Sequence, residues 1–496
     1  MNLKTSHTVG SDGISSYLLQ KTIHNILEPL TNIFNLSFKQ GIFPFCYKTA
    51  KVIPVHKQND VMEMNNYRPI SLLPVLSKML EKLMYSRLNS FIDSNNFLSD
   101  AQYGFRKFKS TELAVLDLTQ SIMSNMDAKN HTIALFLDIK KAFDSINHSI
   151  LLSKLYHIGV RGPAYTWFNS YLSMRSQYVN LNGASSERLS ISTGVPQGSV
   201  LGPLLFLIFI DDLSRVSSCL RTILFADDTT LFYSGPNIGE LTEIFNRELV
   251  KISSWLNANK LLINVTKTNY MIFGPRIMTN RFDINLVLNQ TSLSRVFSIK
   301  FLGFIIRDNL SWDKHINWIS NRICKLIGIL YKLKNKFTRD IILKLYYSMM
   351  YPLLCYGIII WGSSPPTKIK PLKLAQNYYL RCLFSLPKFT HISSYYKKAN
   401  LLTLDQIYKF WVAKFMYRIR QNTYSSFFTS LFKKSYSSYS SRHHDDYCKP
   451  YHRLKIHNLS ISSQGVVIWN NIPLDIKDLN NINLFKKRVR NFIFFN

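Results

Sequence analysis

The run "ILFADDTTLF", residues 223–232, places two adjacent carboxylates, Asp227 and Asp228, inside an otherwise apolar stretch. Two ionised carboxylates side by side raise each other's pKa unless a cation lies between them. Burying such a pair is costly, so the run indicates either a bound metal ion or an exposed turn. The flanking residues have β-type composition, which predicts a hairpin with both acids at its tip.

A metal ion at this tip needs a further oxygen ligand from another part of the chain. In "IALFLDIKKAFD" a predicted buried strand, 133–137, ends in Asp138, whose carboxylate can face the hairpin tip across a sheet. Carboxylates from two elements suit Mg²⁺ better than zinc, and two such ions about 4 Å apart are the usual arrangement for phosphoryl transfer. Taken alone, the acid pair has a simpler interpretation as an exposed acidic turn.

The charge of the chain favours a nucleic-acid partner. Its 496 residues include 61 Lys and Arg against 29 Asp and Glu, which gives a formal net charge of +32. A ribosomal or chromatin-like protein could also be this basic, but such proteins normally have fewer aromatic residues than the 14% found here. With 46% hydrophobic residues the chain can bury a large core and form more than one domain.

The sequence predicts an intracellular protein of the cytoplasm and nucleus. Its six cysteines include no C-x-x-C pair, so neither a disulfide framework nor a cysteine zinc site is indicated. The N-terminus has no signal-peptide pattern. The apolar runs "LGPLLFLIFI" and "YPLLCYGIIIW" are about half of the ~20 residues that a membrane span requires.

Hydrophobic patterning predicts an α/β core followed by a basic helical region. Helices are expected at 14–40 and 240–263, a turn and then a helix at 67–92, and a strand pair around Gly303. From residue 313 the pattern is helical, and residues 331–400 carry twelve Lys or Arg against the single acid Asp340. Five interleaved tyrosines suit a module that follows phosphates, although helical spacing predicts that about half of them are core: Tyr331, Tyr346, Tyr347, Tyr378 and Tyr379.

Three motifs, "FLDIKKAFD", "GVPQGSVLGP" and "FADD", occur in this order and resemble the palm of non-LTR retrotransposon reverse transcriptases. Further segments are similar to the fingers and closing palm motifs of that family: "AKVIPVHK", "NYRPISLLPVLSKMLEKLMYSRL", "QYGFRKFKST", "NVTKTNYMIF" and "FLGFII". The similarity covers about residues 40–310. A collinear set of motifs is far more specific than any one of them.

The resemblance implies a right-hand polymerase of α/β class, with an RRM-like palm of antiparallel sheet and helices, fingers, a helical basic thumb and a helical C-terminal extension. The expected division is an N-terminal helical extension at 1–36, a fingers and palm domain at 37–310, a thumb-like region at 311–400, and an extension at 401–496 with a flexible linker near 433–448.

The resemblance also implies the metal site. Asp138, Asp227 and Asp228 would be the catalytic carboxylates and, with the Ile139 backbone carbonyl, would bind two Mg²⁺ ions, with Mn²⁺ as an alternative. We expect Asp227 to face Asp138 and bind both ions, so that it tolerates substitution less than Asp228.

Other residues match positions that the family uses around the incoming nucleotide. Phe143 would lie under the sugar and exclude a ribose 2′ hydroxyl. Gln197 and Gly198 would lie near the nucleotide and template, with Gly194 also allowing close backbone approach. Lys57 and Arg68 would hold the triphosphate, and Lys267 would protonate pyrophosphate. Each has a simpler interpretation: a core phenylalanine, a plain loop, exposed or salt-bridged basic residues.

The function that follows from the resemblance is RNA-directed DNA polymerisation. The chain would extend a DNA primer 3′ hydroxyl on an RNA template with deoxynucleotide triphosphates (dNTPs) and would hold the RNA–DNA hybrid. One alternative is a catalytically decayed remnant that still binds RNA. Another is a splicing-associated maturase of the same fold, although no intron-binding domain is recognisable. Oligomeric state is not indicated.

Two features depart from the family pattern. The segment "HHDDYCKPYH", residues 443–452, contains neither C-x-x-C nor a clean H-x₃₋₅-H pair, so a disordered polar loop is a better interpretation than a metal site. The fingers motifs begin near residue 47, which leaves no room before them for the endonuclease of many relatives. We therefore expect either a fragment of a longer element or dependence on nicks made elsewhere.

Overall fold

The computed structural model describes residues 5–57, 60–274, 284–333, 336–434 and 446–495. The first part of the chain mixes helices and strands: α1 (Ser16–Gln40), β1 (Thr49–His56), β2 (Tyr67–Leu72), α2 (Val75–Ser94), α3 (Thr111–Asp127), β3 (His131–Leu137), α4 (His148–His157), α5 (Gly162–Leu172), β4 (Arg175–Leu181), β5 (Ala184–Ser185), β6 (Leu189–Ile191) and α6 (Gly202–Ile210).

The middle part is mostly β-structure around one long helix: β7 (Arg221–Phe225), β8 (Asp228–Gly235), α7 (Ile238–Ala258), β9 (Asn269–Phe273), β10 (Val287–Leu288), β11 (Thr291–Ser292), β12 (Ser294–Arg295), β13 (Ser298–Phe301) and β14 (Phe304–Arg307). The last part is helical: α9 (Asp313–Leu333), α10 (Arg339–Leu345), α11 (Tyr351–Cys355), α12 (Ile358–Trp361), α13 (Pro366–Leu383), α14 (Ser393–Lys398), α15 (Leu404–Arg420), α16 (Ser426–Ser430), α17 (Ile461–Asn470), α18 (Leu474–Lys477) and α19 (Ile482–Phe495).

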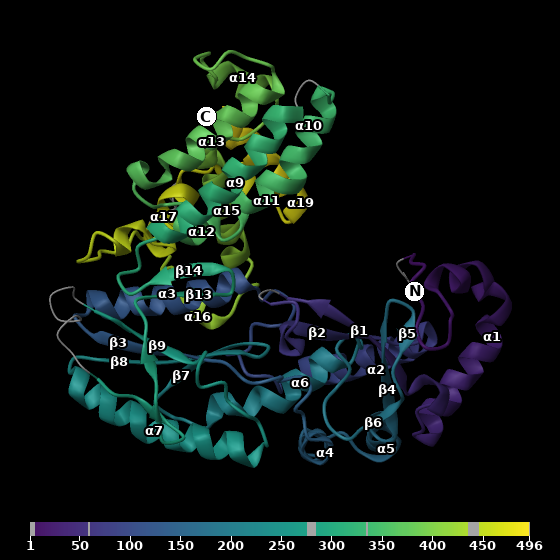
Figure 1. Cartoon of the computed structure of the whole chain (residues 1–496). Coiled ribbons are helices and arrows are strands. Elements are labelled where there is room, and N and C mark those ends of the chain that lie inside the picture. Colours follow the sequence, from purple (N-terminus) through teal and green to yellow (C-terminus); the bar gives the residue numbers. More distant parts are fainter. Residues whose placement is uncertain (1–4, 58–59, 275–283, 334–335, 435–445, 496) are drawn as a thin grey trace.

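A five-stranded sheet with the order β12-β9-β3-β8-β7 forms the centre of the molecule (Figure 1). Strand β3 is antiparallel to both of its neighbours, β8 and β9, while β12 is parallel to β9. A second sheet has the order β2-β1-β4-β5, with β6 also paired to β4. In Figure 1 it lies between the first sheet and α1. The molecule is therefore a mixed α/β protein, as the patterning predicted.

Strand β3 is buried along its whole length because both faces of the central sheet are covered. Side chains alternate along a strand, and the alternate residues Ala134 and Phe136 belong to the core that contains α3. Ile133, Leu135 and Leu137 belong to the other core, which contains α7. In Figure 1 these two helices lie on opposite sides of the sheet.

The two covering helices have local sequence signals that fix where they begin. In α3 the N-cap Ser110 accepts a hydrogen bond from Leu113 N–H, and in α7 the N-cap Asn237 accepts one from Gly239 N–H. Helix α7 is amphipathic, with its buried residues at helical spacing: Leu241, Phe245, Leu249, Ile252 and Leu256. Polar residues on its other face meet solvent, so it covers one side of the sheet.

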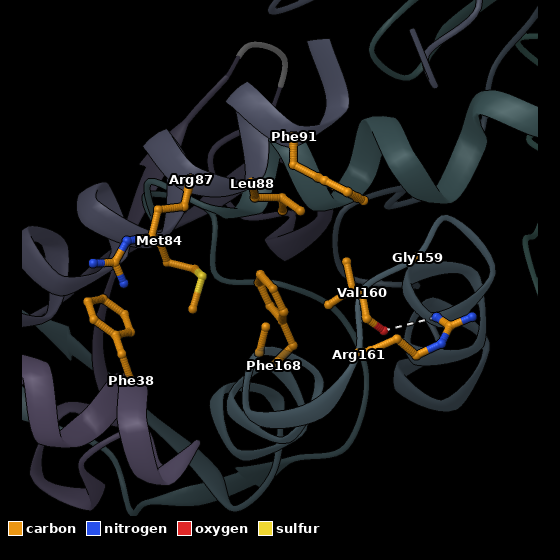
Figure 2. A pocket seen from close by; sticks show the side chains of 10 residues that line it. Phe38, Met84, Arg87, Leu88, Phe91, Gly159, Val160, Arg161 and Phe168 are labelled. Atoms are coloured by element: carbon orange, nitrogen blue, oxygen red, sulfur yellow. Dashed lines mark hydrogen bonds between the residues drawn. The ribbon is translucent and has the colours of Figure 1, made fainter. Parts of the chain in front are cut away.

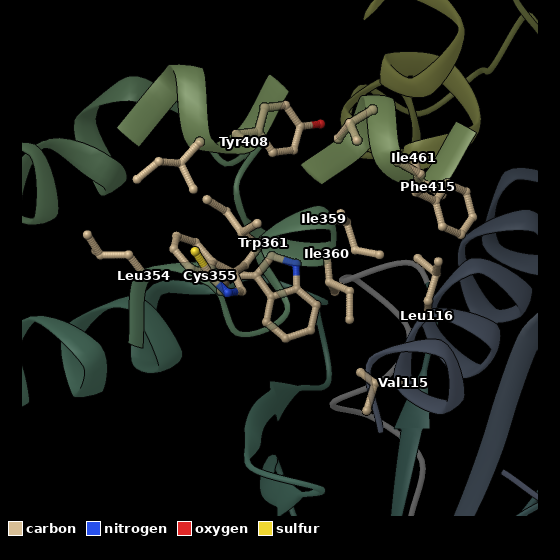
Figure 3. Packing of buried hydrophobic residues seen from close by; sticks show 14 of the residues in the cluster. Val115, Leu116, Leu354, Cys355, Ile359, Ile360, Trp361, Tyr408, Phe415 and Ile461 are labelled. Carbon is tan, nitrogen blue, oxygen red and sulfur yellow. The ribbon is translucent and has the colours of Figure 1, made fainter. Parts of the chain in front are cut away.

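The C-terminal helices share one core with α3. Figure 3 shows Val115 and Leu116 of α3 close to Ile359 and Ile360 of α12, with residues of α15 and α17 above them. Trp361 and Trp469 are fully buried in this core. The regions expected at 311–400 and 401–496 therefore pack together and against the central part of the chain.

Several predicted elements differ in detail from the structure. The helix predicted at 14–40 and the strand pair around Gly303 are confirmed, as α1 and as β13 with β14. The segment "YRPISL" was wrongly predicted as a turn: it is strand β2, paired with β1. The helix predicted at 240–263 ends at Ala258, because Lys260 has a left-handed backbone with φ of 57°.

The five tyrosines of the basic helical region divide as the spacing suggested. Tyr346 and Tyr379 are buried, while Tyr331, Tyr347 and Tyr378 are exposed. Over the described ranges, no helix combines the length and apolar character needed to cross a bilayer.

The burial of β3 on both faces predicts a large stability effect at its centre. Leu135→Ala should lower the free energy of unfolding by about 2–5 kcal/mol, because Leu135 is fully buried and a cavity would remain. Chemical denaturation followed by circular dichroism measures this change. Leu181→Ala on β4, where the leucine is 54% exposed, is the matched control and should change stability little. Equal effects of the two substitutions would contradict the packing described.

Candidate active site

Asp138 follows the last residue of β3, and its backbone is held from both sides. Its N–H donates to Thr268 Oγ1 at 3.2 Å, and its carbonyl oxygen accepts from Asn264 N–H at 2.8 Å. Both partners belong to the turn before β9. The half-buried Asp138 side chain therefore starts from a fixed point at the end of the central strand.

The predicted hairpin is present, with its turn at Ala226 and Asp227. Phe225 pairs with Asp228 and closes the hairpin between β7 and β8, so Asp228 is the first residue of β8 instead of lying in the turn. Ala226 has φ of 54°, a left-handed conformation that is uncommon for alanine. Register pairs Leu137, one residue before Asp138, with Thr229, one residue after Asp228, which brings both acids to the same edge of the sheet.

The segment "QYGF" supports this turn, although no role was predicted for its individual residues. Gln102 is fully buried, and its Oε1 accepts hydrogen bonds from Ala226 N–H at 3.1 Å and Gly104 N–H at 2.8 Å. A Cβ on Gly104 would lie 2.5 Å from the Ala226 nitrogen, so only glycine permits this approach. Gln102 and Gly104 therefore stabilise the unusual backbone of the turn.

The carboxylates at the tip influence each other strongly. Burial, then the charges of Asp227 and Asp138, raise the pKa of Asp228 to about 6. Burial and the charge of Asp138 also raise the pKa of Asp227, while Arg68 acts in the opposite direction. Both residues keep solvent access, so the protein desolvates them only partly. The three acids thus form one coupled electrostatic group.

The donor set fits a divalent cation. A cation bound between the three carboxylates would offset the negative charges that raise the pKa of Asp227 and of Asp228, and the hard carboxylate oxygens suit Mg²⁺ or Mn²⁺. The Ile139 carbonyl would add a fourth oxygen ligand, because the backbone hydrogen bonds beside the Ile139–Ile263 bridge are made by Asp138 and Lys140 and not by Ile139. Among the described residues, the ligand oxygens of the three carboxylates do not all lie within 4.8 Å of one another.

Phe143 lies five residues after Asp138 and is held by an aromatic contact. Its ring stacks on that of the fully buried Phe206 in α6, with ring centroids 4.6 Å apart and an interplanar angle of 24°. Its carbonyl accepts from Val195 N–H at 2.9 Å. Phe143 is only partly buried, so one side of the ring remains accessible.

Gln197 is linked to the segment that carries Phe143. Its Nε2 donates to both Asp144 carboxylate oxygens at 3.0 Å, and its carbonyl accepts from Ser71 N–H in β2 at 2.8 Å. Gly198 has φ of 135°, and a Cβ there would lie 2.4 Å from the Ser71 oxygen. Gly194 is similarly close to the Asp144 backbone. Both glycines therefore permit approaches that no other residue allows.

The three basic residues named from the sequence are all exposed. Arg68 lies on β2 opposite Val55 and acts on the pKa of Asp227. Lys57 follows β1, and its charge opposes the burial that raises the pKa of Asp144. Lys267 is in the turn that binds the Asp138 backbone. Arg68 thus acts on the acid group and Lys57 on the Gln197 side, while Lys267 is related to the acids only through the backbone of its turn.

A second polar residue that the sequence interpretation missed anchors the Gln197 loop. Glu81 of α2 is fully buried, and its Oε2 accepts from Val200 N–H at 2.7 Å and Leu201 N–H at 3.2 Å. Burial raises the pKa of this carboxyl, while the nearby Arg175 opposes that effect. An acid on the apolar stripe of a helix, beside Met84 and Leu88, was the available signal.

A cavity of about 400 Å³ lies elsewhere, between α1, α2 and α5. Figure 2 shows Met84, Leu88 and Phe168 around it, with Arg87 over the Phe38 ring at 4.3 Å. None of the candidate catalytic residues lines this apolar cavity. It is an apolar pocket between helices and not a part of the acid group.

The segment "HHDDYCKPYH" was predicted as a disordered loop. Its first three residues, His443, His444 and Asp445, lie outside the described residues. Asp446 forms an ion pair with Lys477 at 3.0 Å. The segment itself contains no H-x₃₋₅-H pair, but its last residue, His452, forms such a pair with His457, which lies beyond it.

Comparison with known proteins gives consistent results. The family model described as reverse transcriptase (RNA-dependent DNA polymerase) matches residues 55–306. The chain is 28% identical to the probable RNA-directed DNA polymerase from transposon BS of Drosophila melanogaster, over 85% of this chain and 48% of that protein. It is 26% identical to the RNA-directed DNA polymerase from mobile element jockey of the same species, over 76% and 42%.

The chain spans about half the length of the curated relatives that it matches. Among solved structures, apo telomerase from Candida tropicalis aligns over 73% of this chain and 63% of that one, at 12% identity and a TM-score of 0.42. That similarity is too low to support an argument. The family model covers just over half of the chain, and the chain therefore belongs to the reverse transcriptase family, among those of non-LTR retrotransposons.

Proposed function

We propose that the chain is an RNA-directed DNA polymerase that extends a primer 3′ hydroxyl on an RNA template with dNTPs. The observation that carries the proposal is the meeting of Asp138, Asp227 and Asp228 at one edge of the central sheet, where they share one electrostatic environment. The family match supports the reaction, because the relatives of this chain are named RNA-directed DNA polymerases.

Asp138, Asp227, Asp228 and the Ile139 carbonyl would hold two divalent ions. Reverse transcriptases generally use such ions, and the oxygen donors favour Mg²⁺, with Mn²⁺ as the alternative. When bound, these ions lower the pKa of the primer hydroxyl and neutralise charge on the leaving pyrophosphate. The protein contributes the fixed spacing of the carboxylates, since both segments that carry them are bonded to the sheet.

The surrounding residues position the nucleotide. Arg68 would hold the triphosphate through two guanidinium donors, and Lys57 would add a point charge. Phe143, supported by Phe206, would exclude the ribose 2′ hydroxyl by contact with its accessible side. Lys267 would donate a proton to a pyrophosphate oxygen.

The Gln197 loop would lie against the template and the paired nucleotide. Its backbone is bonded to β2, which carries Arg68, and its amide to Asp144, which follows Phe143. Gly198 leaves the backbone open to close approach by the nucleic acid. The residues proposed to contact the triphosphate, the sugar and the template are thereby connected by a few hydrogen bonds.

In the proposed right-hand architecture, the sheet with β3 and its covering helices is the palm, and the sheet with β1 and β2 belongs to the fingers. Together they would occupy 37–310, after the N-terminal extension at 1–36. The basic helices of 311–400 would be the thumb and hold the RNA–DNA hybrid, supported by the exposed Tyr331, Tyr347 and Tyr378. The extension at 401–496 shares its core with the thumb.

Loss of one catalytic carboxylate tests the proposal directly. Asp227→Asn should reduce primer extension on an RNA template by more than about 10²-fold, because it removes a charge that binds the ions. Binding of the primed template, measured by fluorescence anisotropy, should persist. Asp475→Asn, an exposed acid of α18, is the matched control.

Full activity of Asp227→Asn would contradict the assignment of Asp227 to the catalytic metal site. If the unaltered protein binds the primed template but does not extend it at all, the chain is an RNA-binding remnant instead.

The raised pKa of Asp228 predicts a pH-dependent stability. Its folded pKa of about 6 lies above its usual 3.8, so the ionised carboxylate destabilises the metal-free folded state above pH 6. Asp228→Asn should therefore raise the thermal midpoint at pH 8 in EDTA, and the difference should close as pH falls towards 4. Excess Mg²⁺ should raise the midpoint of the unaltered protein more than that of the variant. Identical melting curves at pH 8 would contradict the coupling.

Selection of deoxynucleotides should depend on the ring of Phe143. Phe143→Val should raise the ratio of kcat/KM for a ribonucleotide over the matching dNTP by about tenfold or more, because the clash with the 2′ hydroxyl is removed. Single-nucleotide incorporation kinetics measure this ratio. Phe495→Val, at the exposed C-terminal end of α19, is the control and should leave the ratio unchanged. An unchanged ratio in Phe143→Val would show that the ring has only a packing role.

A further inference from the structure

A group of three potential metal ligands lies near the start of β3, whereas the active-site residue Asp138 follows the end of that strand. Asp127 is the last residue of α3, and His452 and His457 precede α17. The Nδ1 atoms of His452 and His457 lie 3.4 Å and 3.5 Å from Asp127 Oδ2. In the part of the chain that the structure describes, one oxygen and two nitrogens of this group lie within 4.8 Å of one another.

These distances fit a shared ion better than hydrogen bonds. An N–H···O bond is normally 2.7–3.2 Å long, whereas the edges of a tetrahedral zinc site with bonds of 2.0–2.1 Å are about 3.4 Å. His457 is 3% exposed, and its Nδ1 is fully buried without a hydrogen-bond partner. A buried ring nitrogen that is left unpaired, and that faces a carboxylate, marks a place for a cation.

The carboxylate of Asp127 is held in place by two backbone N–H groups. Asp127 Oδ1 accepts from Leu454 N–H at 2.7 Å, and its Oδ2 accepts from Arg453 N–H at 3.2 Å. These bonds fold the loop between the two histidines around the end of α3. The carboxylate is thereby fixed in direction before any ion binds.

The Nε2 atoms of the two histidines are held by polar side chains. His457 Nε2 lies 2.8 Å from Gln120 Nε2, which also donates to Ser462 Oγ at 3.1 Å, and His452 Nε2 lies 3.4 Å from the same Ser462 oxygen. These contacts fix the rings while both Nδ1 atoms face the Asp127 carboxylate.

The two imidazole rings are stacked, with centroids 3.5 Å apart and an interplanar angle of 22°. The stack brings the two Nδ1 atoms side by side at the carboxylate. Binding one ion through both atoms requires the rings to fan apart at this edge.

We propose that Asp127, His452 and His457 form a zinc site that joins the end of α3 to the C-terminal region. Two imidazole nitrogens and one carboxylate oxygen suit Zn²⁺, and its analogues Co²⁺ and Ni²⁺, and do not suit Mg²⁺. The site is separate from the polymerase ions in both ligands and metal type. Its role is structural: it fixes the segment 452–457 onto the helix that covers one face of the central sheet.

Zinc titration of the full chain tests this assignment. After chelation, the protein in excess Mg²⁺ is titrated with Zn²⁺ alone against a chromophoric chelator, so that Mg²⁺ occupies the oxygen sites. We expect one equivalent of Zn²⁺ to bind and to raise the thermal midpoint. His457→Gln should weaken binding by more than about tenfold, while His391→Gln, at an exposed histidine, should not.

A second variant guards against misfolding. Asp127→Asn keeps an oxygen that can accept from Leu454 N–H but removes the charge and the acceptor for Arg453 N–H, so it should lower the metal-free thermal midpoint only slightly and still lose at least about tenfold in zinc affinity. Co²⁺ should give the absorption of a tetrahedral site in the unaltered protein and lose it in the variant. The proposal is overturned if the unaltered protein binds no stoichiometric Zn²⁺, or if Asp127→Asn and His457→Gln both bind it with unchanged affinity.

Discussion

The whole site depends on one strand that is paired on both edges and covered on both faces. Strand β3 lies between β8 and β9, and its alternate side chains enter two different cores. A strand held in this way cannot slip in register, because a shift by one residue would exchange the two sets of side chains. The position of Asp138 at its end is therefore set by burial and pairing of apolar residues, and not by interactions of the carboxylate itself.

The acids opposite Asp138 lie on a turn that is held under strain. Ala226 has an uncommon backbone conformation, which the buried Gln102 stabilises by accepting from its N–H. The mutual repulsion of the carboxylates is a second cost that the fold sustains at the same place. The paired strands on each side hold the strained turn and the repelling carboxylates in place. The segment is therefore preorganised to bind a cation.

The sequence was most informative where a residue type conflicted with its surroundings. Acids inside an apolar run pointed to the hairpin and to Asp138, and the motif order pointed to the family. The structural roles of Gln102 and Glu81 were not predicted, because their hydrogen-bond partners lie 124 and 119 residues away in the sequence. No local sequence pattern indicates hydrogen bonds over such separations. Strand β2 was predicted as a turn because it contains a proline and polar residues, which are typical of turns. His452 and His457 form a potential metal site only together with Asp127, which lies 325 residues before His452.

The hydrogen bond from Asp138 N–H to Thr268 has a consequence for the order in which the protein forms. It joins residues 130 positions apart, and β9, which flanks β3 on one side, directly follows it in the chain. Closing so long a loop costs entropy that only the completed sheet repays. A chain emerging from the ribosome can therefore build α2 and α3 early, while the edge that gathers the three aspartates is assembled only after about residue 273 has been made.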